Sequence, residues 1–432
     1  MKTTRYNPIS SQMYIRNREK LVSQLKINSL VIVNSNDEMP KNGDQTFLFR
    51  QHSTLFYLTG IDQEKTILTI CPHHPNPSLR EIIFIINADP TTLVWQGYKL
   101  SPQDVTELSG VKTVKFVDSF ESVLRELMVF SENVYLYQND YIKFFTDVPC
   151  KDDRFALEIK NKYPLHNYLP LTAITSPMRA VKEPEEIAQM KIACGITRDA
   201  FLRVLKMVKP GVMEYEVEAE YTHEFIRQGA NGHAFDPIIA SGKDTCVLHY
   251  INNNKECKDG DLLLMDVGAD YGNYAADMSR TIPINGKFSK RQKQVYMSVL
   301  DVLNQATALL VPGSCIDKWH KQVCKLIENE LVKLGLLTSF DIENQNPDSP
   351  AFFKYYMHGS GHFLGLDTHD TGSKFQTFVP GMVITCEPGI YIPDENIGIR
   401  LENDILITDN QPVNLMSDIP ILPEEIEKIM CN

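Results

Sequence analysis

Two aspartates, Asp266 and Asp277, frame a segment that is typical of a β-hairpin. An apolar run from Leu262 leads into Asp266, the residues Asp-Tyr-Gly-Asn follow as a turn, and a second strand leads away from it. If Tyr271 and Gly272 are the two central turn residues, the two aspartates lie opposite each other, with Cβ atoms about 4.5–5.5 Å apart. Carboxylates that close repel each other unless a cation lies between them, so the hairpin predicts a metal site.

A second pair of acids, Glu387 and Glu402, shows the same arrangement later in the chain. A turn centred on Asp394 and Glu395 places these two glutamates opposite each other, although a longer loop would shift the register. Both glutamates follow or lie within apolar strands. Two hairpins that each present a pair of opposed carboxylates indicate that one architecture occurs twice in this half of the chain.

Histidines gather between the two hairpins. Three of the eleven histidines, His358, His362 and His369, fall within twelve residues, and the glycines among them argue for backbone held close to a site. Four carboxylates and a histidine form a ligand set for two divalent ions. Oxygen-rich ligation suits manganese, whereas mixed nitrogen and oxygen ligation also admits cobalt, iron or zinc. Paired ions lie about 3.5–4 Å apart, share bridging carboxylates and activate a water molecule.

Composition and the absence of other motifs exclude several classes. The chain carries no G-x-S-x-G, H-E-x-x-H, P-loop or G-x-G-x-x-G motif. Its net charge of −12 argues against nucleic-acid binding, and no apolar run reaches the roughly 18 residues of a membrane span. Nine cysteines without a C-x-x-C pair fit free thiols in a reducing compartment. We therefore expect a cytoplasmic protein, with a basic transit peptide as the open alternative.

The elements that must position these residues fall into two domains, predicted at 1–175 and 176–432, because prolines punctuate the stretch 169–186. The first domain has the pattern of an α/β fold. Its predicted helices and strands are Arg16–Leu25, Leu30–Val33, Thr66–Ile70, Glu81–Ile86, Phe120–Phe130 and Asn133–Tyr137. The second domain shows two helix pairs, each followed by strands, which predicts an α+β fold with a pseudo-two-fold repeat. The predicted pairs are 183–207 with 214–229, and 290–310 with 317–334.

Together these segments resemble the dinuclear metallopeptidase family with the pita-bread (creatinase/aminopeptidase) fold, and within it the aminopeptidase P group. The resemblance rests on the D-x10-D hairpin, the H-G-x-G-H-x-x-G-L segment from His358, the C-E-P-G strand from Cys386 and the G-I-R-L-E-N-D strand from Gly398. It extends outside the site to Phe49–Gly60 and Ile239–Tyr250, and covers roughly residues 14–430. Each motif alone is weak evidence, whereas the joint set is specific.

The resemblance implies a ligand set and a reaction. Asp266 would bind one ion, Asp277 and Glu402 would bridge both, and His362 and Glu387 would complete the second. A hydroxide bridging two ions, expected to be Mn²⁺, would attack the carbonyl of the first bond in peptides of the form Xaa-Pro-Yaa. The proline nitrogen carries no hydrogen and must be protonated as it leaves, which gives a task to an imidazole.

It also implies roles around the ligands. Glu387 would handle the proton of the nucleophile, and His358 and His369 would steady the tetrahedral intermediate or pass a proton to the proline nitrogen. The substrate site would be lined or supported by His249, Tyr391 and Arg400. Trp95 could reach the substrate site of a neighbouring subunit.

Alternatives remain open at this point. A prolidase would cleave only Xaa-Pro dipeptides with the same catalytic residues, and loop geometry decides between the two. A protein of another class, a catalytically silent interaction module on the same fold, is disfavoured because all five ligands are present. A homodimer or homotetramer is expected from the resemblance alone. Cys386 precedes a ligand on a strand and points to the opposite face, so we expect it to pack rather than react.

Overall fold

The computed structural model describes residues 4–141, 143–144 and 146–431, and the chain divides into two compact units. One unit is Pro8–Arg179. The other begins at Ala180 and also contains the N-terminal residues up to Asn7. This division falls a few residues after the boundary expected at 175/176, and it differs from that expectation in joining the first residues to the C-terminal unit.

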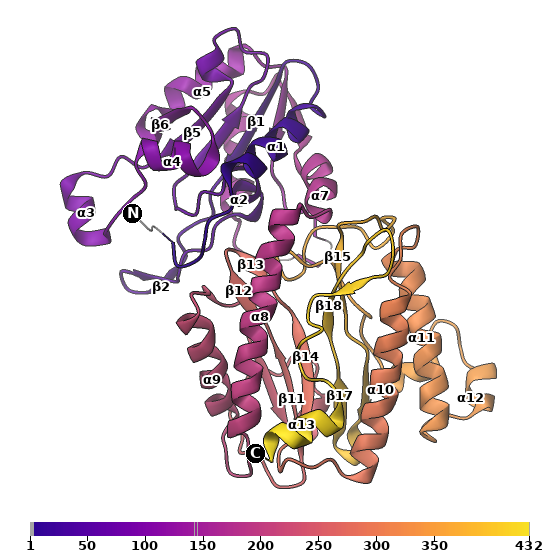
Figure 1. Ribbon diagram of the computed structural model, residues 1–432. Helices are drawn as coiled ribbons and strands as arrows, with labels where there is room; N and C mark the ends of the chain where they lie inside the picture. Colours follow the sequence, from indigo (N-terminus) through magenta and orange to yellow (C-terminus); the bar gives the residue numbers. More distant parts are fainter. Residues whose placement is uncertain (1–3, 142, 145, 432) are drawn as a thin grey trace. The chain divides into compact units, whose positions relative to one another are not determined.

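The N-terminal unit is built on a six-stranded mixed sheet with the order β6-β5-β4-β1-β7-β8 (Figure 1). The central strand β1 pairs parallel with β7 and antiparallel with β4, and all six of its residues are buried. A two-stranded hairpin, β2–β3, lies outside this sheet. The strands are β1 (Ser29–Asn34), β2 (Pro40–Asn42), β3 (Gln45–Thr46), β4 (Ile67–Ile70), β5 (Glu81–Ile85), β6 (Thr113–Phe116), β7 (Asn133–Leu136) and β8 (Asn167–Pro170).

Helices surround this sheet. Leu124 and Leu127 of α5 and Ile159 of α6 share one apolar cluster with residues of β1 and β5. The helices are α1 (Ser11–Val22), α2 (Ser53–Thr59), α3 (Pro90–Gln96), α4 (Pro102–Ser109), α5 (Phe120–Val129), α6 (Lys151–Lys162) and α7 (Thr172–Ala180). The predicted strands of this unit are confirmed. The first helix begins earlier than predicted because the Ser10 side chain caps it by accepting from the Gln12 amide.

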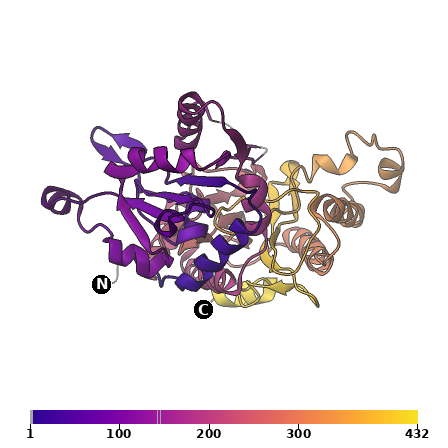
Figure 2. The same ribbon diagram turned by 90° about the horizontal axis from the view of Figure 1, so that it is seen from above.

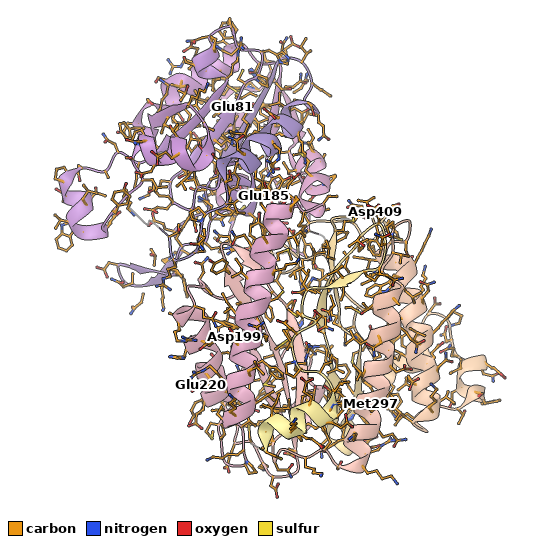
Figure 3. The ribbon with its side chains drawn as sticks, in the orientation of Figure 1. Glu81, Glu185, Asp199, Glu220, Met297 and Asp409 are labelled. Carbon is orange, nitrogen blue, oxygen red and sulfur yellow. The ribbon has the colours of Figure 1, made fainter. Side chains whose placement is uncertain are left out.

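The C-terminal unit contains two long helix pairs, and the members of each pair lie side by side (Figures 1 and 2). Partly exposed acids such as Asp199 on the first helix and Glu220 on the second show how these helices turn polar residues outward (Figure 3). Both predicted pairs are confirmed. The helices are α8 (Pro184–Met207), α9 (Glu214–Arg227), α10 (Lys290–Ala308), α11 (Ile316–Lys333), α12 (Ser339–Glu343) and α13 (Pro423–Met430).

Strands follow each helix pair, which gives the repeated arrangement of the pita-bread fold. The first set forms the sheets β10-β11-β14 and β13-β12-β9, and the second forms β15-β18-β19 and β16-β17. The apolar run before Asp266 is fully buried, as predicted. The strands are β9 (Gly232–His233), β10 (Ile238–Ser241), β11 (Leu262–Val267), β12 (Ala269–Tyr271), β13 (Tyr274–Ala275), β14 (Met278–Pro283), β15 (Val383–Cys386), β16 (Gly389–Ile392), β17 (Ile397–Arg400), β18 (Asn403–Leu406) and β19 (Val413–Asn414).

Within the residues that the structure describes, none of the helices is both long and apolar enough to cross a bilayer.

Candidate metal centre

The first hairpin turns one residue later than predicted. Its central turn residues are Gly272 and Asn273, with φ angles of 59° and 66°. A two-residue turn of this type requires positive φ at both positions, which glycine and asparagine adopt more easily than tyrosine. As a result Asp266 lies opposite Ser279, and the prediction that it faces Asp277 directly is wrong.

Asp277 instead occupies a break between β13 and β14. Gly268 makes this break possible, because a Cβ atom there would lie 1.7 Å from the carbonyl oxygen of Ala276. Asp277 is two residues from Ser279 and therefore shares the face of Asp266. Burial raises the pKa of Asp277, and the nearby charge of Asp266 adds to this rise, so the two carboxylates lie close together. The carboxylates thus still meet, as diagonal rather than direct neighbours.

The register predicted for the second hairpin is confirmed. Cys386 pairs with Asn403, and Gly389 pairs with Arg400, so Glu387 and Glu402 occupy matching positions in the gap between these two ladders. Backbone amides freed by the gap bind other segments. The Glu387 amide donates to the Ser360 carbonyl (3.0 Å), and the Glu402 amide donates to the Ser279 carbonyl of the first hairpin (3.1 Å).

His362 lies where the two hairpins meet. Its Nε2 is 3.4 Å from Oδ2 of Asp277 and 3.9 Å from Oε1 of Glu387. Asp277, His362 and Glu402 each offer one ligand atom, and these three atoms lie within 4.8 Å of one another. Nδ1 of His362 is 2.9 Å from the Phe363 carbonyl, which orients Nε2 toward the carboxylates.

The charges of the cluster fit a bound cation. Asp277 and Glu402 are 4% and 1% exposed. Burial, reinforced by the neighbouring acids, raises the pKa of both carboxyls well above the usual range. Oδ1 of Asp266 is buried and finds no hydrogen-bond partner among the described residues. Four carboxylates and one imidazole, with an oxygen left unsatisfied, form a donor set that suits divalent ions.

Arg400 makes hydrogen bonds along one side of the cluster. Its guanidinium donates to Oδ2 of Asp266 (2.6 Å), to the Tyr391 hydroxyl (3.1 Å) and to Oγ of Ser279 (2.8 Å). The Ser279 hydroxyl in turn donates to Oε2 of Glu402 (2.8 Å). Sequence reasoning missed Ser279, because only the correct register of the first hairpin places it opposite Asp266.

The remaining histidines flank the ligands. Nε2 of His358 is 2.9 Å from the Tyr391 hydroxyl, and its Nδ1 is 3.7 Å from Oε2 of Glu387. Burial, with a smaller effect of the Arg400 charge, lowers the pKa of His358 to about 3, so its ring is neutral at pH 7. His249 is exposed and near enough to affect the same ring electrostatically.

His369 and Trp95 complete the predicted set. The ring of His369 lies 4.3 Å from that of His362, centroid to centroid. Trp95 belongs to the N-terminal unit, on α3, and 82% of it is exposed. Of the eleven predicted positions, nine lie together in the cluster. His249 is linked to it through its electrostatic effect on His358, and Trp95 belongs to the N-terminal unit.

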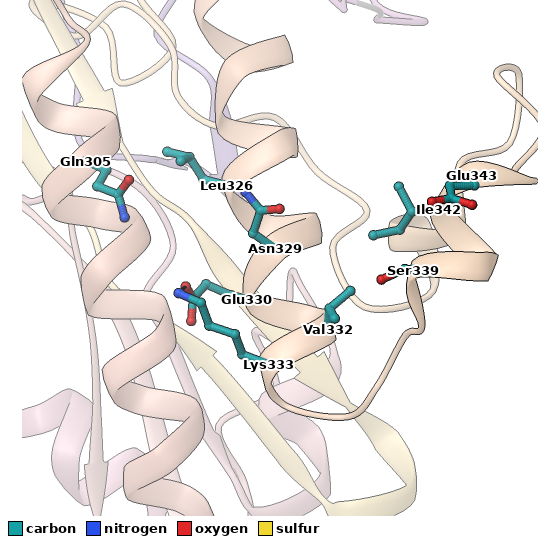
Figure 4. Close-up of a pocket in the computed structure, with 9 residues that line it drawn as sticks. All are labelled: Gln305, Leu326, Asn329, Glu330, Val332, Lys333, Ser339, Ile342 and Glu343. Atoms are coloured by element: carbon teal, nitrogen blue, oxygen red, sulfur yellow. Dashed lines mark hydrogen bonds and ion pairs between the residues drawn. The ribbon is translucent and has the colours of Figure 1, made fainter.

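A separate cavity of about 450 Å³ lies among α10, α11 and α12 (Figure 4). Its lining comes from these three helices and includes Leu326, Asn329 and Glu330 of α11 and Ile342 of α12. The metal cluster, by contrast, is built from the hairpins and the histidine segment. The two features are therefore distinct.

The fold and the cluster define a metal-dependent peptidase. The profile of metallopeptidase family M24 matches residues 188–409, and that of the aminopeptidase P N-terminal domain matches residues 14–137. The chain belongs to metallopeptidase family M24, in its aminopeptidase P branch. Both the predicted fold class and the predicted family are confirmed.

Individual relatives agree with this assignment. The chain is 35% identical to the Xaa-Pro aminopeptidase of Escherichia coli (strain K12), over 98% of each sequence. The structure of aminopeptidase P from E. coli with the inhibitor Pro-Leu matches with a TM-score of 0.88 at 33% identity, covering 98% of this chain and 99% of that one. Aminopeptidase PepP from Pseudomonas aeruginosa matches with a TM-score of 0.88 at 30% identity, covering 98% of both. The protein is thus a hydrolase that uses divalent metal ions, and the prolidase alternative is not favoured.

Proposed function

We propose that this chain removes the N-terminal residue from peptides with proline in second position, and that the cluster described above is its catalytic centre. The observation that carries the proposal is that two buried carboxylates from separate hairpins, Asp277 and Glu402, and His362 each place one ligand atom within 4.8 Å of the others. Neighbouring carboxylates that are this deeply buried need a cation to compensate their charge. A peptidase of family M24 needs metal ions.

The residues that would hold the metal ions are those that the family resemblance implies: Asp266, Asp277, His362, Glu387 and Glu402. Among the four carboxylates, Asp277 and Glu402 are the most deeply buried. Manganese is the metal we expect, because four of the five ligands are carboxylates. Bound divalent ions supply charge that polarises the scissile carbonyl and lowers the pKa of water.

The residues of the chain handle the protons. Glu387 accepts a proton from the attacking water, whose oxygen adds to the carbonyl carbon of the first residue. His358, held neutral against Tyr391, steadies the intermediate. The exposed His369 delivers a proton to the proline nitrogen as the carbon–nitrogen bond breaks. Arg400 fixes Asp266 and Tyr391, and His249 contacts the substrate.

A homo-oligomer is proposed from the exposed helix α3. Every residue of this helix is at least partly exposed, and Val94 and Trp95 are 81% and 82% exposed. A second copy of the chain would cover this apolar surface, as a dimer or tetramer, and Trp95 would contact the substrate site of that copy. Light scattering on the purified protein and on Trp95→Ala tests this. A monomeric wild-type protein would exclude it.

We also propose a cytoplasmic location. All nine cysteines are free thiols, and most are buried, which supports a reducing compartment. Fractionation of cells that express the chain would test the location, and recovery in an oxidising compartment would contradict it.

The function is tested with metal-stripped protein, whose folding is first confirmed by circular dichroism. Arg-Pro-Pro and, separately, Gly-Pro are incubated with and without manganese, and the released amino acid is measured. Metal-dependent cleavage of the tripeptide with little of the dipeptide is expected. Cleavage of the dipeptide alone would indicate a prolidase. Cleavage of neither, with any divalent ion, would refute the enzyme assignment.

A further inference from the structure

A fully buried ion pair lies beside the metal centre without contributing a ligand. Nζ of Lys182 is 3.0 Å from Oδ2 of Asp370, and both side chains are 1% exposed. Burying two charges costs more solvation energy than a single ion pair usually returns, so such a pair is weak evidence for stability. Stability alone therefore does not explain why this ion pair lies beside the metal centre.

The pair lies at the point where the histidine segment closes on itself. The Asp370 amide donates to the Phe363 carbonyl (2.9 Å), which closes the loop between them. His362 immediately precedes Phe363, and His369 immediately precedes Asp370. Closing the loop therefore brings the two histidines together, and their ring centroids lie 4.3 Å apart.

Gly365 shows how closely the loop lies over the ion pair. A Cβ atom at this position would come within 2.2 Å of Oδ2 of Asp370 and 2.8 Å of Cε of Lys182. The φ angle of Gly365 is not in the left-handed region, so space rather than backbone strain accounts for the glycine. The loop and the ion pair are therefore packed as one unit.

The same loop is tied to both hairpins. The Gly365 carbonyl accepts from the Ala275 amide of β13 (2.8 Å), two residues before Asp277. The Leu364 amide donates to the Val383 carbonyl of β15 (3.1 Å), on the strand that leads to Glu387. Displacing the loop would thus disturb both pairs of carboxylates.

A second buried acid extends the network to the start of α8. Oε1 of Glu186 accepts from the Tyr274 hydroxyl (3.0 Å), and its carboxylate also accepts from the Glu183 amide (2.8 Å). Burial raises the pKa of Glu186 to about 7, and the charge of Lys182 partly offsets this rise. Lys182 thus pairs with Asp370, an acid from a distant part of the chain, and also favours the charged form of Glu186.

We propose that Lys182 and Asp370 are positioning residues that hold the loop 363–370 in place before metal or substrate arrives, so that His362 and His369 face the carboxylates. The effect of this ion pair on catalysis rests on the proposed function, whereas its effect on the position of the loop does not. Positioning of a ligand by its supporting partners typically accounts for about 10–100-fold in activity or metal affinity.

Hydrogen exchange on the metal-free protein tests the loop directly. Asp370→Asn and Gly365→Ala are expected to speed amide exchange in a peptide spanning 363–372 by about tenfold or more, by opening the loop. Leu331→Ala, a cavity-forming change at a fully buried position on α11, is the control for general destabilisation. Faster exchange in both variants but not in the control supports the proposal. Exchange in this peptide no faster than in the control overturns it.

Steady-state kinetics on the metal-loaded enzyme separates positioning from stability. The double variant Lys182→Met with Asp370→Leu removes both charges together, and such replacements often preserve or raise stability. We expect it to melt near the wild-type temperature, with kcat on Arg-Pro-Pro lowered about 10–100-fold and KM changed much less. A stable double variant with wild-type kcat overturns the proposal.

Failure of the proposed function gives a different result. If the wild-type protein cleaves no peptide with any metal, the function is refuted. Hydrogen exchange still decides whether the ion pair positions the loop.

Discussion

The two acid-bearing hairpins of the C-terminal unit bring carboxylates to the same cluster through different backbone arrangements. In the second hairpin the strands keep one register through a gap, and Glu387 and Glu402 occupy matching positions in that gap. In the first hairpin Asp266 stays within a ladder, and only Asp277 lies in a break. Each hairpin nevertheless provides one deeply buried carboxylate and one that is 15–20% exposed.

This difference teaches that a break in strand pairing, rather than direct opposition across a hairpin, positions the two deeply buried carboxylates. These inner carboxylates are Asp277 and Glu402, and the outer ones are Asp266 and Glu387. At each break a backbone amide is released and binds the other hairpin. The Asp277 amide donates to Oδ2 of Asp404 (3.2 Å), and the Glu402 amide donates to the Ser279 carbonyl (3.1 Å). The two halves are thus joined where the ligands lie, and changing one hairpin should affect the other.

The inner and outer carboxylates should differ most in metal affinity. Asp277→Asn and Glu402→Gln are each expected to abolish stable binding of both ions and to lower kcat/KM by more than the ~100-fold seen for supporting residues. Asp266→Asn should retain one ion. Metal content after gel filtration measures this. Equal metal content in Asp266→Asn and Glu402→Gln would remove the distinction between inner and outer ligands.

Arg400 tests the link from the second hairpin to the first. Arg400→Met leaves Asp266 without its cation and Ser279 without a donor, so we expect kcat to fall about 10–100-fold. Arg400→Lys should recover little of this loss, because an ammonium cannot reach the three acceptors that the guanidinium serves. Full activity of Arg400→Lys would show that charge alone suffices.

The stability of the metal-free protein should rise on acidification from pH 8 to pH 5. The pKa values of Asp277 and Glu402 lie well above the usual range, and those of Glu186 and Asp404 are about 7, all chiefly through burial. The folded protein therefore takes up protons that the unfolded chain, with carboxyl pKa values near 4, does not. This gain is complete below about pH 4 and is lost as the pH rises through the folded-state values.

Thermal melts across this pH range measure the effect. Asp277→Asn should flatten the profile by removing one buried charge. With saturating manganese the trend should reverse, since ligands must lose their protons to bind. A metal-free protein that loses stability between pH 8 and pH 6 would contradict the prediction.

The two turns offer a smaller test. Asn273 in the first hairpin and Asn396 in the second both have positive φ, at 66° and 54°. Replacing either by alanine should cost about 1 kcal/mol in the free energy of unfolding, because alanine adopts this conformation less readily. Urea unfolding of both variants measures the cost. A much larger loss for one turn would show that its hairpin contributes more to the stability of the unit.

Cys386 should give the smallest effect. Its side chain is fully buried, and Sγ lies 4.0 Å from the Leu303 carbonyl of α10, away from Glu387. Burial raises the pKa of its thiol, which makes it a poor nucleophile. Cys386→Val conserves volume and should cost less than the turn variants, under about 1 kcal/mol, with activity retained. Loss of activity in a folded variant would give this cysteine a chemical role.

The sequence singled out the acids that the structure brings together, because acids within apolar strands are rare without a cation, and because side chains alternate along a strand. It located the register of the second hairpin correctly, since proline and asparagine bound its turn. It misplaced the first turn by one residue, because a tyrosine, a glycine and an asparagine stand together and only backbone angles choose between them. Short helices such as α3 were missed for lack of any apolar periodicity.

The supporting residues were beyond sequence reasoning. Ser279 becomes visible only with the correct register. Lys182 stands near a predicted domain boundary, where a lysine is ordinarily solvated, and its burial depends on a loop nearly two hundred residues later. Contacts of this kind are set by tertiary packing, which periodicity does not encode.

Residues near the start of the sequence pack against a hairpin of the C-terminal unit that is synthesised much later. Tyr6 packs edge-on against Tyr271, the Asn7 amide donates to the Tyr271 hydroxyl (3.2 Å), and the Asn7 carbonyl accepts from Gln189 (3.1 Å). During synthesis these residues are made more than two hundred and fifty residues before their partner next to the first turn. The first acid-bearing hairpin therefore acquires its full packing only after the N-terminal unit has been synthesised, and a fusion placed close to Tyr6 should disturb the packing of Tyr271 in this hairpin.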